Sequence, residues 1–323
     1  MASLLSVENL QVQFQTKKGI NTAVDGVSFS VEKGRILGIV GESGCGKSVT
    51  SMSILQLLGS NARISGGSIK LDGKELIGLP EKEMCRIRGN DIAMIFQDPM
   101  TALNPTLTIG TQLMEPIMLH QNCGKKEAWT RAVDVLKRVG IAAPEKRMKE
   151  YPHQLSGGMR QRVMIAMAVS CEPRLLIADE PTTALDVTIQ AQILELMCEL
   201  REKMGTAIML ITHDMGVVAE TADDVLVLYA GKAVEYGSIE DIFERPKHPY
   251  TQGLLNSIPR LDEDVELLNT IEGTVPAPDA MSAGCRFAPR CPYGKDRCMK
   301  EKPGVYHAGN SLVSCFRYEG EKE

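Results

Sequence analysis

The sequence predicts an α/β protein in which a largely parallel sheet is joined by an antiparallel β-layer and a helical subdomain. Three observations carry this prediction. A glycine-rich loop at 41–48 stands directly behind the apolar run 36–40 and ahead of a helical pattern. The short apolar runs 175–178 and 207–211 do not alternate, which is typical of parallel strands covered on both faces. Apolar residues at helical spacing between these two runs complete a doubly wound strand–helix–strand unit.

The N-terminal segment predicts the antiparallel layer. Apolar and polar residues alternate at 10–14 and again at 27–31, which is the period of half-buried strands. Residues 68–71 predict a further antiparallel strand, because Asp72 and Gly73 supply a turn.

The glycine-rich loop is predicted to bind phosphate. Its glycines let the backbone curl until successive N–H groups point inward, and the following helix adds the positive end of its dipole. Lys47 can reach the outer phosphates of a nucleotide, and the Ser48 hydroxyl can coordinate the accompanying Mg²⁺. A flexible glycine loop is the alternative. The predicted nucleotide-binding residues are Gly41, Ser43, Gly44, Cys45, Gly46, Lys47, Ser48 and Val49.

A helical subdomain is predicted at about 98–173. Its pattern is clearest where Val133, Leu136 and Val139 form one stripe beside basic residues. Further along, Ser156 and the two glycines that follow it precede a stretch with helical spacing. These residues predict a second anion cradle at a helix N-terminus, although in isolation they are an ordinary N-cap serine with a glycine turn.

Asp179 and Glu180 follow the apolar run 175–178, at the strand end where ligands bind in open α/β sheets. Asp179 is predicted to hold Mg²⁺ through water, and Glu180 to polarise an attacking water as a general base. Taken alone, such a pair is equally well the solvated start of a loop. The phosphate-binding loop upstream favours the catalytic interpretation, and the glutamate favours hydrolysis over nucleotide storage.

The chain has 323 residues, of which 43% are hydrophobic and 24% charged, so it can bury a large core. We expect one domain at 1–255 and a C-terminal region at 256–323, where Pro, Gly and Cys become dense. Late in the first domain, the apolar run 225–229 and the short strand after it predict a hairpin that closes the sheet.

The composition also limits the partners and the location. The net charge of −5 and the scattered basic residues disfavour a nucleic-acid partner. No apolar run approaches the ~20 residues of a membrane-spanning helix. The start lacks the basic head and long apolar run of a secretion signal, so we expect a cytoplasmic protein with reduced cysteines.

Four cysteines gather in the C-terminal region, with five, six and sixteen residues between neighbours, namely Cys285, Cys291, Cys298 and Cys315. The segment has too little apolar content to fold unaided. A cytoplasmic location argues against disulfides, and the close Cys-x-x-Cys pairs of most zinc sites are missing. Four thiolates in this context favour a [4Fe–4S] cluster, with zinc and ordinary reduced thiols as alternatives.

Six motifs in this order resemble the ATP-binding cassette family over roughly residues 4–255. The motifs are the loop at 41–48, Gln97, the segment 156–158, the pair 179–180, the triplet 184–186 and His213. The resemblance implies a RecA-like P-loop core with the antiparallel and helical subdomains, and two cassettes that face each other head to tail.

The resemblance also assigns roles to residues. Ser156, Gly157 and Gly158 are expected to complete the ATP site of the partner cassette, and Asp186 belongs to the nucleotide-binding set. Gln97 is expected to contact Mg²⁺ and link the nucleotide to the helical subdomain, His213 to contact the γ-phosphate, and Phe14 to stack on adenine. For Gln97, His213 and Phe14 the alternative is an ordinary strand-end or core residue. Met159 stands where many cassettes have Gln, so affinity at that site is expected to differ.

Residues 245–255 and 284–292 resemble the C-terminal extension of the peptide and nickel importer branch of this family. This resemblance implies an ATP-hydrolysing subunit that energises import of dipeptides or short oligopeptides from the cytoplasmic face of the bacterial inner membrane. The implied partners are a second, related ATPase subunit in a heterodimer, two membrane permease subunits and a periplasmic peptide-binding protein.

Three alternatives to peptide import stay open at this point. One is the ATPase of a nickel or other small-solute importer. Another is a soluble cassette ATPase of DNA repair or translation. In the third, the cysteine region is a redox or iron sensor that regulates the ATPase.

Overall fold

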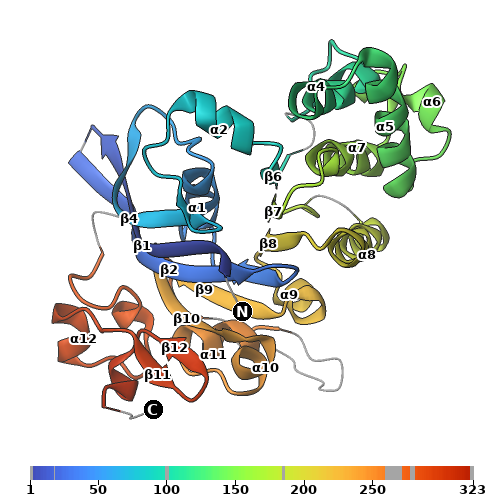
Figure 1. Ribbon diagram of the computed structural model, residues 1–323. Helices are drawn as coiled ribbons and strands as arrows, with labels where there is room; N and C mark the ends of the chain where they lie inside the picture. The colour runs from blue at the N-terminus through green and yellow to red at the C-terminus, as the bar shows by residue number, and fades with distance from the viewer. Residues whose placement is uncertain are drawn as a thin grey trace.

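The computed structural model describes residues 3–17, 19–98, 102–183, 186–258, 271–276 and 281–320. Figure 1 shows a β-rich body on one side and a separate group of helices on the other. The chain crosses into the helical group after β6 and returns through β7. The predicted α/β architecture is therefore confirmed.

A four-stranded antiparallel sheet forms the predicted N-terminal layer, in the order β2-β1-β4-β5. Its strands are β1 (Ser3–Thr16), β2 (Gly19–Glu32), β4 (Ala62–Leu71) and β5 (Lys74–Glu75). Leu71 pairs with Lys74 across the turn at Asp72 and Gly73, both of which have positive φ, as expected for a two-residue hairpin.

The second sheet has eight strands in the order β11-β12-β10-β9-β3-β8-β7-β6. The parallel part comprises β3 (Ile36–Val40), β6 (Ile92–Ile95), β7 (Leu175–Asp179), β8 (Ala207–Ile211) and β9 (Asp224–Tyr229). The antiparallel part comprises β10 (Lys232–Ser238), β11 (Tyr306–Ala308) and β12 (Ser311–Val313).

The predicted closing hairpin is wrong in one respect. β9 and β10 do form an antiparallel hairpin, but β10 is not an edge strand. Glu235 and Tyr236 of β10 pair with Val313 and Leu312 of β12, so the C-terminal region adds two strands to the same sheet. These strands are only three residues long, which is too short for alternation to reveal them in the sequence.

Helices surround the sheets. Those outside the helical group are α1 (Lys47–Ile54), α2 (Glu81–Ile87), α8 (Val187–Met204), α9 (Met215–Thr221), α10 (Ile239–Glu244), α11 (Pro249–Asn256) and α12 (Asp296–Lys300). Short 3₁₀ turns are η1 (Pro152–Gln154), η3 (Ala288–Arg290) and η4 (Phe316–Tyr318).

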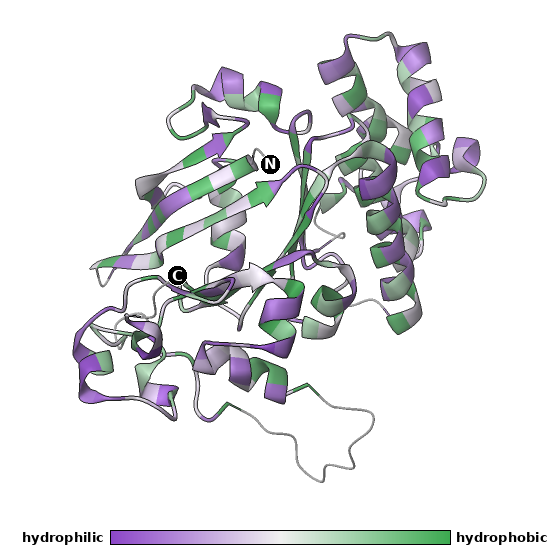
Figure 2. Cartoon of the chain, turned by 60° about the horizontal axis from the view of Figure 1, so that its bottom comes forward, coloured by the Kyte–Doolittle hydropathy of each residue, from purple (hydrophilic) through white to green (hydrophobic). Residues whose placement is uncertain are grey.

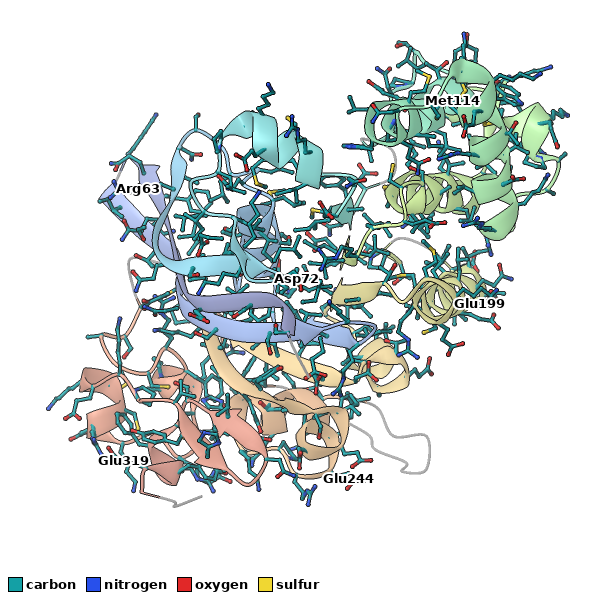
Figure 3. The ribbon with its side chains drawn as sticks, viewed as in Figure 1. Arg63, Asp72, Met114, Glu199, Glu244 and Glu319 are labelled. Carbon is teal, nitrogen blue, oxygen red and sulfur yellow. The ribbon has the colours of Figure 1, made fainter. Side chains whose placement is uncertain are left out.

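The helical group consists of α4 (Ile109–Gln121), α5 (Lys125–Arg138), α6 (Pro144–Arg147) and α7 (Gly157–Val169). The predicted stripe is confirmed, because Val133, Leu136 and Val139 are all buried. Figure 3 shows Met114 on α4 within this group, where its side chain is buried. The exact boundaries of the predicted domains, at 255 and near 98 and 173, remain predictions.

Both faces of the parallel strands are buried, as the runs without alternation predict. In β3, Ile36 and Val40 belong to one hydrophobic cluster, whereas Leu37 and Ile39 belong to the cluster on the opposite face. Figure 2 shows the same central strands as a hydrophobic band through the molecule. Burial at roughly 25 cal/mol per Å² of apolar surface makes this two-sided packing the main source of stability. It also fixes the strand ends that carry the site.

Candidate nucleotide-binding site

Four parallel strands bring the predicted site residues to one edge of the sheet. β3 leads into Gly41, β6 into Gln97, β7 into Glu180 and β8 into His213. Because parallel strands end on the same side, the side chains after them meet at that edge. The sequence places these residues far apart, and the strand order β3-β8-β7-β6 brings them together.

The phosphate loop, residues 41–48, joins β3 to α1 in a shape that requires glycine. A Cβ atom on Gly41 would lie 2.1 Å from the carbonyl oxygen of Leu228 on β9, which no side chain can tolerate. Gly46 caps α1 with a φ of 99°, a left-handed conformation that disfavours other residues. Ser43 and Gly44 are exposed, whereas Cys45 is buried under the loop.

Lys47 lies inside its own loop. Its Nζ donates to the carbonyl oxygens of Gly41 at 2.6 Å and Glu42 at 3.2 Å, and its side chain is buried. The ammonium group is thus held at the centre of the loop, where a bound phosphate would need a cation. Val49, on the first turn of α1, packs its partly buried side chain against the hydrophobic core and contributes support rather than a polar contact.

Asp179 and Ser48 lie together, as expected for two ligands of one Mg²⁺ ion. Burial raises the pKa of the Asp179 carboxyl, which is only 5% exposed, while a hydrogen bond from Ser48 and the charge of Lys47 oppose that shift. A buried carboxylate with this raised pKa gains from a nearby cation, which replaces the solvation it has lost. The donor set of carboxylate and hydroxyl oxygens suits Mg²⁺.

Glu180 is the centre of a hydrogen-bonded group. Its Oε2 accepts from Gln97 Nε2 at 2.8 Å, and its Oε1 lies 3.3 Å from His213 Nδ1. Thr183 Oγ1 donates to Oε2 at 3.0 Å. Burial opposes ionisation, but the hydrogen bonds from Thr183 and His213 and the charge of Lys47 outweigh it, so the pKa of Glu180 lies below its ordinary value. Glu180 is therefore ionised at neutral pH, as a general base must be.

Thr183 is a site residue that the sequence reasoning missed. It stands three positions after Glu180, in a loop with no distinctive pattern of its own. The only available signal was its proximity to the acidic pair, since a threonine within a turn of a catalytic carboxylate can donate back to it.

Ser156, Gly157 and Gly158 start α7, where the Ser156 hydroxyl accepts from the Met159 N–H at 3.3 Å. Figure 1 places α7 in the helical group and α1 beside the antiparallel layer, with β6, β7 and β8 between them. The structure therefore does not bring this segment to the phosphate loop of the same chain. Gly157 has open space around it, so its backbone is accessible to a ligand.

The other predicted nucleotide-binding residues lie on neighbouring elements. Phe14 is half-buried on β1 opposite Asn21 of β2, two residues from Ala23, whose carbonyl oxygen faces Gly46. Asp186 caps α8, because its Oδ1 accepts from the Ile189 N–H at 2.9 Å. The preceding Ala184 and Leu185 of the same predicted motif lie outside the described residues.

All four predicted cysteine ligands line one cavity of about 80 Å³, together with aromatic side chains including Phe287 and Phe316. We call this cavity the cysteine pocket. Burial raises the pKa of Cys285 to about 11 and also raises those of Cys291 and Cys315. None of the nine cysteines forms a disulfide. Among the described residues, no group of three or more His, Cys, Asp or Glu side chains is arranged to hold a single metal ion, so the structure does not show the predicted cluster, which stays a prediction.

The fold and the site together define an ATP-binding cassette ATPase. A phosphate loop and the carboxylates of Asp179 and Glu180 share one sheet edge, and a serine–glycine helix start lies in a separate helical subdomain. The family model described as ABC transporter matches residues 24–183. The model described as oligopeptide/dipeptide transporter, C-terminal region, matches residues 234–298.

Relatives that match this sequence along nearly its whole length identify a narrower class within the cassette family. The oligopeptide transport ATP-binding protein AppD of Bacillus subtilis is 56% identical, over 99% of this chain and 98% of the relative. The oligopeptide transport ATP-binding protein OppD of Escherichia coli is 51% identical, over 98% and 93%. The dipeptide transport ATP-binding protein DppD of B. subtilis is 53% identical, over 100% and 97%. The chain therefore belongs to the family of oligopeptide and dipeptide transport ATP-binding proteins.

Solved structures agree with the cassette fold. The dimeric post-hydrolysis state of the ATP-binding cassette MJ0796, bound to ADP and Pi, superposes with a TM-score of 0.66 at 27% identity. The superposition covers 73% of this chain and 98% of the MJ0796 chain. Within the described residues, no helix is long and apolar enough to cross a membrane.

Proposed function

We propose that this chain hydrolyses ATP to energise an importer of dipeptides or short oligopeptides at the cytoplasmic face of a bacterial inner membrane. The observation that carries the proposal is the ionised Glu180 carboxylate, held by Gln97 and His213 at the edge that also carries the phosphate loop. The peptide substrate is supported by relatives above 50% identity that are named as oligopeptide and dipeptide transport proteins.

Nucleotide binding would use the main chain and Lys47. The loop offers N–H groups at the start of α1, and the ammonium group of Lys47 already lies among its carbonyl oxygens. An entering triphosphate therefore gains a counterion that needs little rearrangement. Ser48 and Asp179 would hold Mg²⁺, with Gln97 reaching it from the side of the helical subdomain. When bound, Mg²⁺ neutralises charge on the phosphates.

Hydrolysis would use Glu180 as the base. Its carboxylate takes a proton from the attacking water, while the hydrogen bonds from Thr183 and Gln97 fix the orientation of its oxygens. His213, whose side chain is 66% exposed, is free to contact the γ-phosphate as well as Glu180. The Glu180 carboxylate would then face the attacking water, and the His213 imidazole would face the γ-phosphate, which passes to that water while ADP leaves.

A complete site would need a second, related ATPase subunit. In this chain, strands β6 to β8 separate the Ser156 segment from the phosphate loop, so its exposed helix start has no triphosphate of its own to bind. We propose that Ser156, Gly157 and Gly158 bind the triphosphate of the partner in a head-to-tail heterodimer. A bacterial cassette that superposes on this chain at 28% identity was solved as a dimer.

The two permease subunits would dock in a groove between the sheet edge and the helical subdomain. This groove has a volume of about 410 Å³ and lies beside Gln97, since Phe96 lines it. Three of its lining side chains are large, apolar and exposed, namely Leu57, Phe96 and Leu119. Exposed apolar side chains around one groove are typical of a protein interface, here for a cytoplasmic helix of the permease. A periplasmic peptide-binding protein would act through the permease.

For the cysteine pocket we propose a [4Fe–4S] cluster. Support comes from four thiols around one apolar cavity, with Arg317 and Lys295 also lining it. A [4Fe–4S] cluster is held by four cysteine thiolates, and this pocket offers four cysteines. Burial raises the pKa of Cys285, Cys291 and Cys315, so these three thiols are protonated at neutral pH and binding of a cluster would release protons.

The cluster proposal is tested by iron and acid-labile sulfide in anaerobically purified protein. We expect about four irons per chain in the wild type and a large loss in Cys291→Ser. Cys85→Ser is the matched control, because Cys85 is exposed on α2, outside the pocket. Stoichiometric zinc, or neither metal, would contradict the proposal.

The transport proposal is tested by uptake in cells whose own copy is replaced by Glu180→Gln. Uptake of labelled dipeptides and oligopeptides should fall to background, while the variant protein still assembles with the membrane subunits. Loss of nickel uptake with normal peptide uptake would favour the nickel-importer alternative. Co-purification with nucleic acid instead of membrane subunits would remove the transport function.

A further inference from the structure

The second residue of the phosphate loop, Glu42, is held from both sides by residues far along the chain. Arg290 Nη1 lies 2.8 Å from its Oε1 and 3.1 Å from its Oε2. The Glu42 N–H donates to the hydroxyl oxygen of Tyr250 at 3.0 Å. Both partners lie beyond the core of the cassette, Tyr250 on α11 and Arg290 in the C-terminal region.

Arg290 is held in place independently of Glu42. Its guanidinium also donates to the carbonyl oxygens of residues 271–273, at 2.9 to 3.2 Å. Its side chain is only 7% exposed and lies 5.8 Å above the ring of Tyr229. A charged group fixed by so many acceptors cannot swing away when the phosphate loop moves. It therefore acts as a rigid anchor for Glu42.

The segment that carries Arg290 is itself packed against the cassette. η3 lies between Cys285 and Cys291, and Phe287 just before it is buried against Tyr229 and Tyr250, with ring centroids 5.1 and 5.4 Å apart. This aromatic packing fixes the position of Arg290 relative to the phosphate loop.

A second arginine of the same segment supports the loop from the other side. Arg286 donates to the Ala230 carbonyl and, at 3.1 Å, to Asp25. Gly231, which follows Ala230 in the chain, donates its N–H to the carbonyl oxygen of Cys45 in the phosphate loop at 2.9 Å. The C-terminal region thus reaches the loop by two routes, one through Glu42 and one through Cys45.

The contact between Arg290 and Glu42 matters for ATP binding because Glu42 carries a negative charge. A carboxylate within a loop that binds a triphosphate repels the ligand unless a cation neutralises it. Lys47 is the proposed counterion of the phosphates. Its Nζ contacts the backbone carbonyl oxygen of Glu42 rather than the Glu42 carboxylate. Arg290 is the cation in contact with both carboxylate oxygens.

We propose that Arg290 is a positioning residue of the ATP site, which neutralises Glu42 and holds the phosphate loop in its binding shape. The C-terminal region then sets the affinity of the cassette for ATP. This inference rests on the proposed ATP binding at the loop, but it does not depend on what the cysteine pocket holds.

The test is a double-mutant cycle on the full chain, read out as the dissociation constant of Mg-ATP and as KM and kcat. Arg290→Gln should weaken ATP binding roughly tenfold, which corresponds to about 1.4 kcal/mol, with kcat at saturating ATP nearly unchanged. Glu42→Gln alone should change affinity little. The double variant should recover most of the lost affinity, because the uncompensated carboxylate is gone.

Arg297→Gln is the matched control, because this arginine of the same region pairs with Glu301 and Glu319 on the surface. It should bind ATP as the wild type does. If Arg290→Gln does not fold, Arg290→Lys carries the test, and it should bind ATP several-fold more weakly because lysine lacks the planar set of donors.

Unchanged affinity in the Arg290 variants, or a double variant no tighter than Arg290→Gln, would overturn the proposal. A merely structural role for Arg290 predicts that second result, since removing a charge from Glu42 cannot repair packing. Failure of the wild-type chain to bind Mg-ATP would instead overturn the proposed function, so the two failures are distinguishable.

Discussion

Glu180 adopts a left-handed backbone conformation with a φ of 46°, which is uncommon for a residue with a side chain. Such conformations cost of order 1 kcal/mol or more and persist only where the surroundings enforce them. Here the Glu180 N–H donates to the Ile211 carbonyl at 2.8 Å, and the carboxylate is bonded to Gln97 and Thr183. The strain is local, and these contacts offset it while they position the carboxylate of Glu180, the proposed base.

Replacing Glu180 with glutamine should separate binding from hydrolysis. The amide keeps the size of the side chain but cannot accept a proton, so ATP should bind normally while turnover falls about 10²-fold or more. Single-turnover hydrolysis and ATP binding by the same preparation provide the measurement. Glu199→Gln is the control, because Glu199 is exposed on α8 at the outer edge of the molecule in Figure 3. Normal turnover in Glu180→Gln would exclude it as the base.

Thr183→Val should shift the pH dependence of hydrolysis. The Thr183 hydrogen bond helps to hold the pKa of Glu180 below its ordinary value, so its loss raises that pKa. The base must be deprotonated to act, and the acid limb of the kcat–pH profile should therefore move to higher pH. Thr130→Val is the control, since that hydroxyl bonds only the backbone of α5. An unmoved acid limb would show that Thr183 does not tune the base.

Residues were predictable from sequence where the chemistry is contiguous. The loop from Gly41 to Ser48 is one continuous motif, so its glycines and lysine together predict phosphate binding. Asp179 and Glu180 are likewise adjacent in the sequence. Gln97 and His213 emerged only through family resemblance, because the strand order that brings them to Glu180 is not visible in the chain. Arg290 was not foreseen at all, since its partner Glu42 lies 248 positions away.

At the scale of elements, α4 presents two different surfaces. Leu119 is 68% exposed and lines the groove beside Gln97, whereas its neighbour Met118 is 40% exposed and lies outside the groove. A proline at position 116 stands within the same helix, also at the groove. The two exposed residues differ in surroundings rather than in chemistry, so they form a matched pair.

Leu119→Lys should block assembly with the membrane subunits. A charge in the apolar groove disfavours docking of a helix, by about 10-fold or more in affinity, without touching the nucleotide site. Co-purification with the permease should be lost, while ATP binding by the isolated chain stays normal. Met118→Lys should assemble normally. Equal assembly by both variants would place the permease elsewhere.

Elements were predictable where they are long or fully buried. The runs without alternation became β7 and β8, and the stripe on α5 faces the core of the helical group. The short strands β11 and β12 were missed, because three residues carry no measurable period. They form through pairing with β10, a tertiary contact that local sequence does not encode.

At the scale of the molecule, the C-terminal region is part of the main sheet rather than an appendage. β12 covers the edge of β10, and Glu235 on β10 accepts hydrogen bonds from the N–H groups of Lys247 and His248. An uncovered β10 would present free backbone groups that can pair with another chain.

A chain that ends at Asn256 should therefore self-associate. Removal of β11 and β12 exposes β10, and loss of Arg286 and Arg290 frees the phosphate loop. We expect oligomers in light scattering and a melting temperature lower by roughly 5 °C or more, since 1 kcal/mol corresponds to about 2–4 °C in a chain of comparable size. The full-length chain, measured alongside, is the reference. A monomeric truncated chain with unchanged melting would show that the hairpin is dispensable.

The late position of this hairpin has a consequence for synthesis. β12 (Ser311–Val313) lies far along the chain from β3, yet both strands belong to the sheet that leads into the phosphate loop. During translation the contact of Arg290 with Glu42 and the pairing of β12 with β10 cannot form until these later residues have left the ribosome. Under the proposal that Arg290 positions the phosphate loop, a chain interrupted before Arg290 is expected to bind ATP less tightly than the full chain.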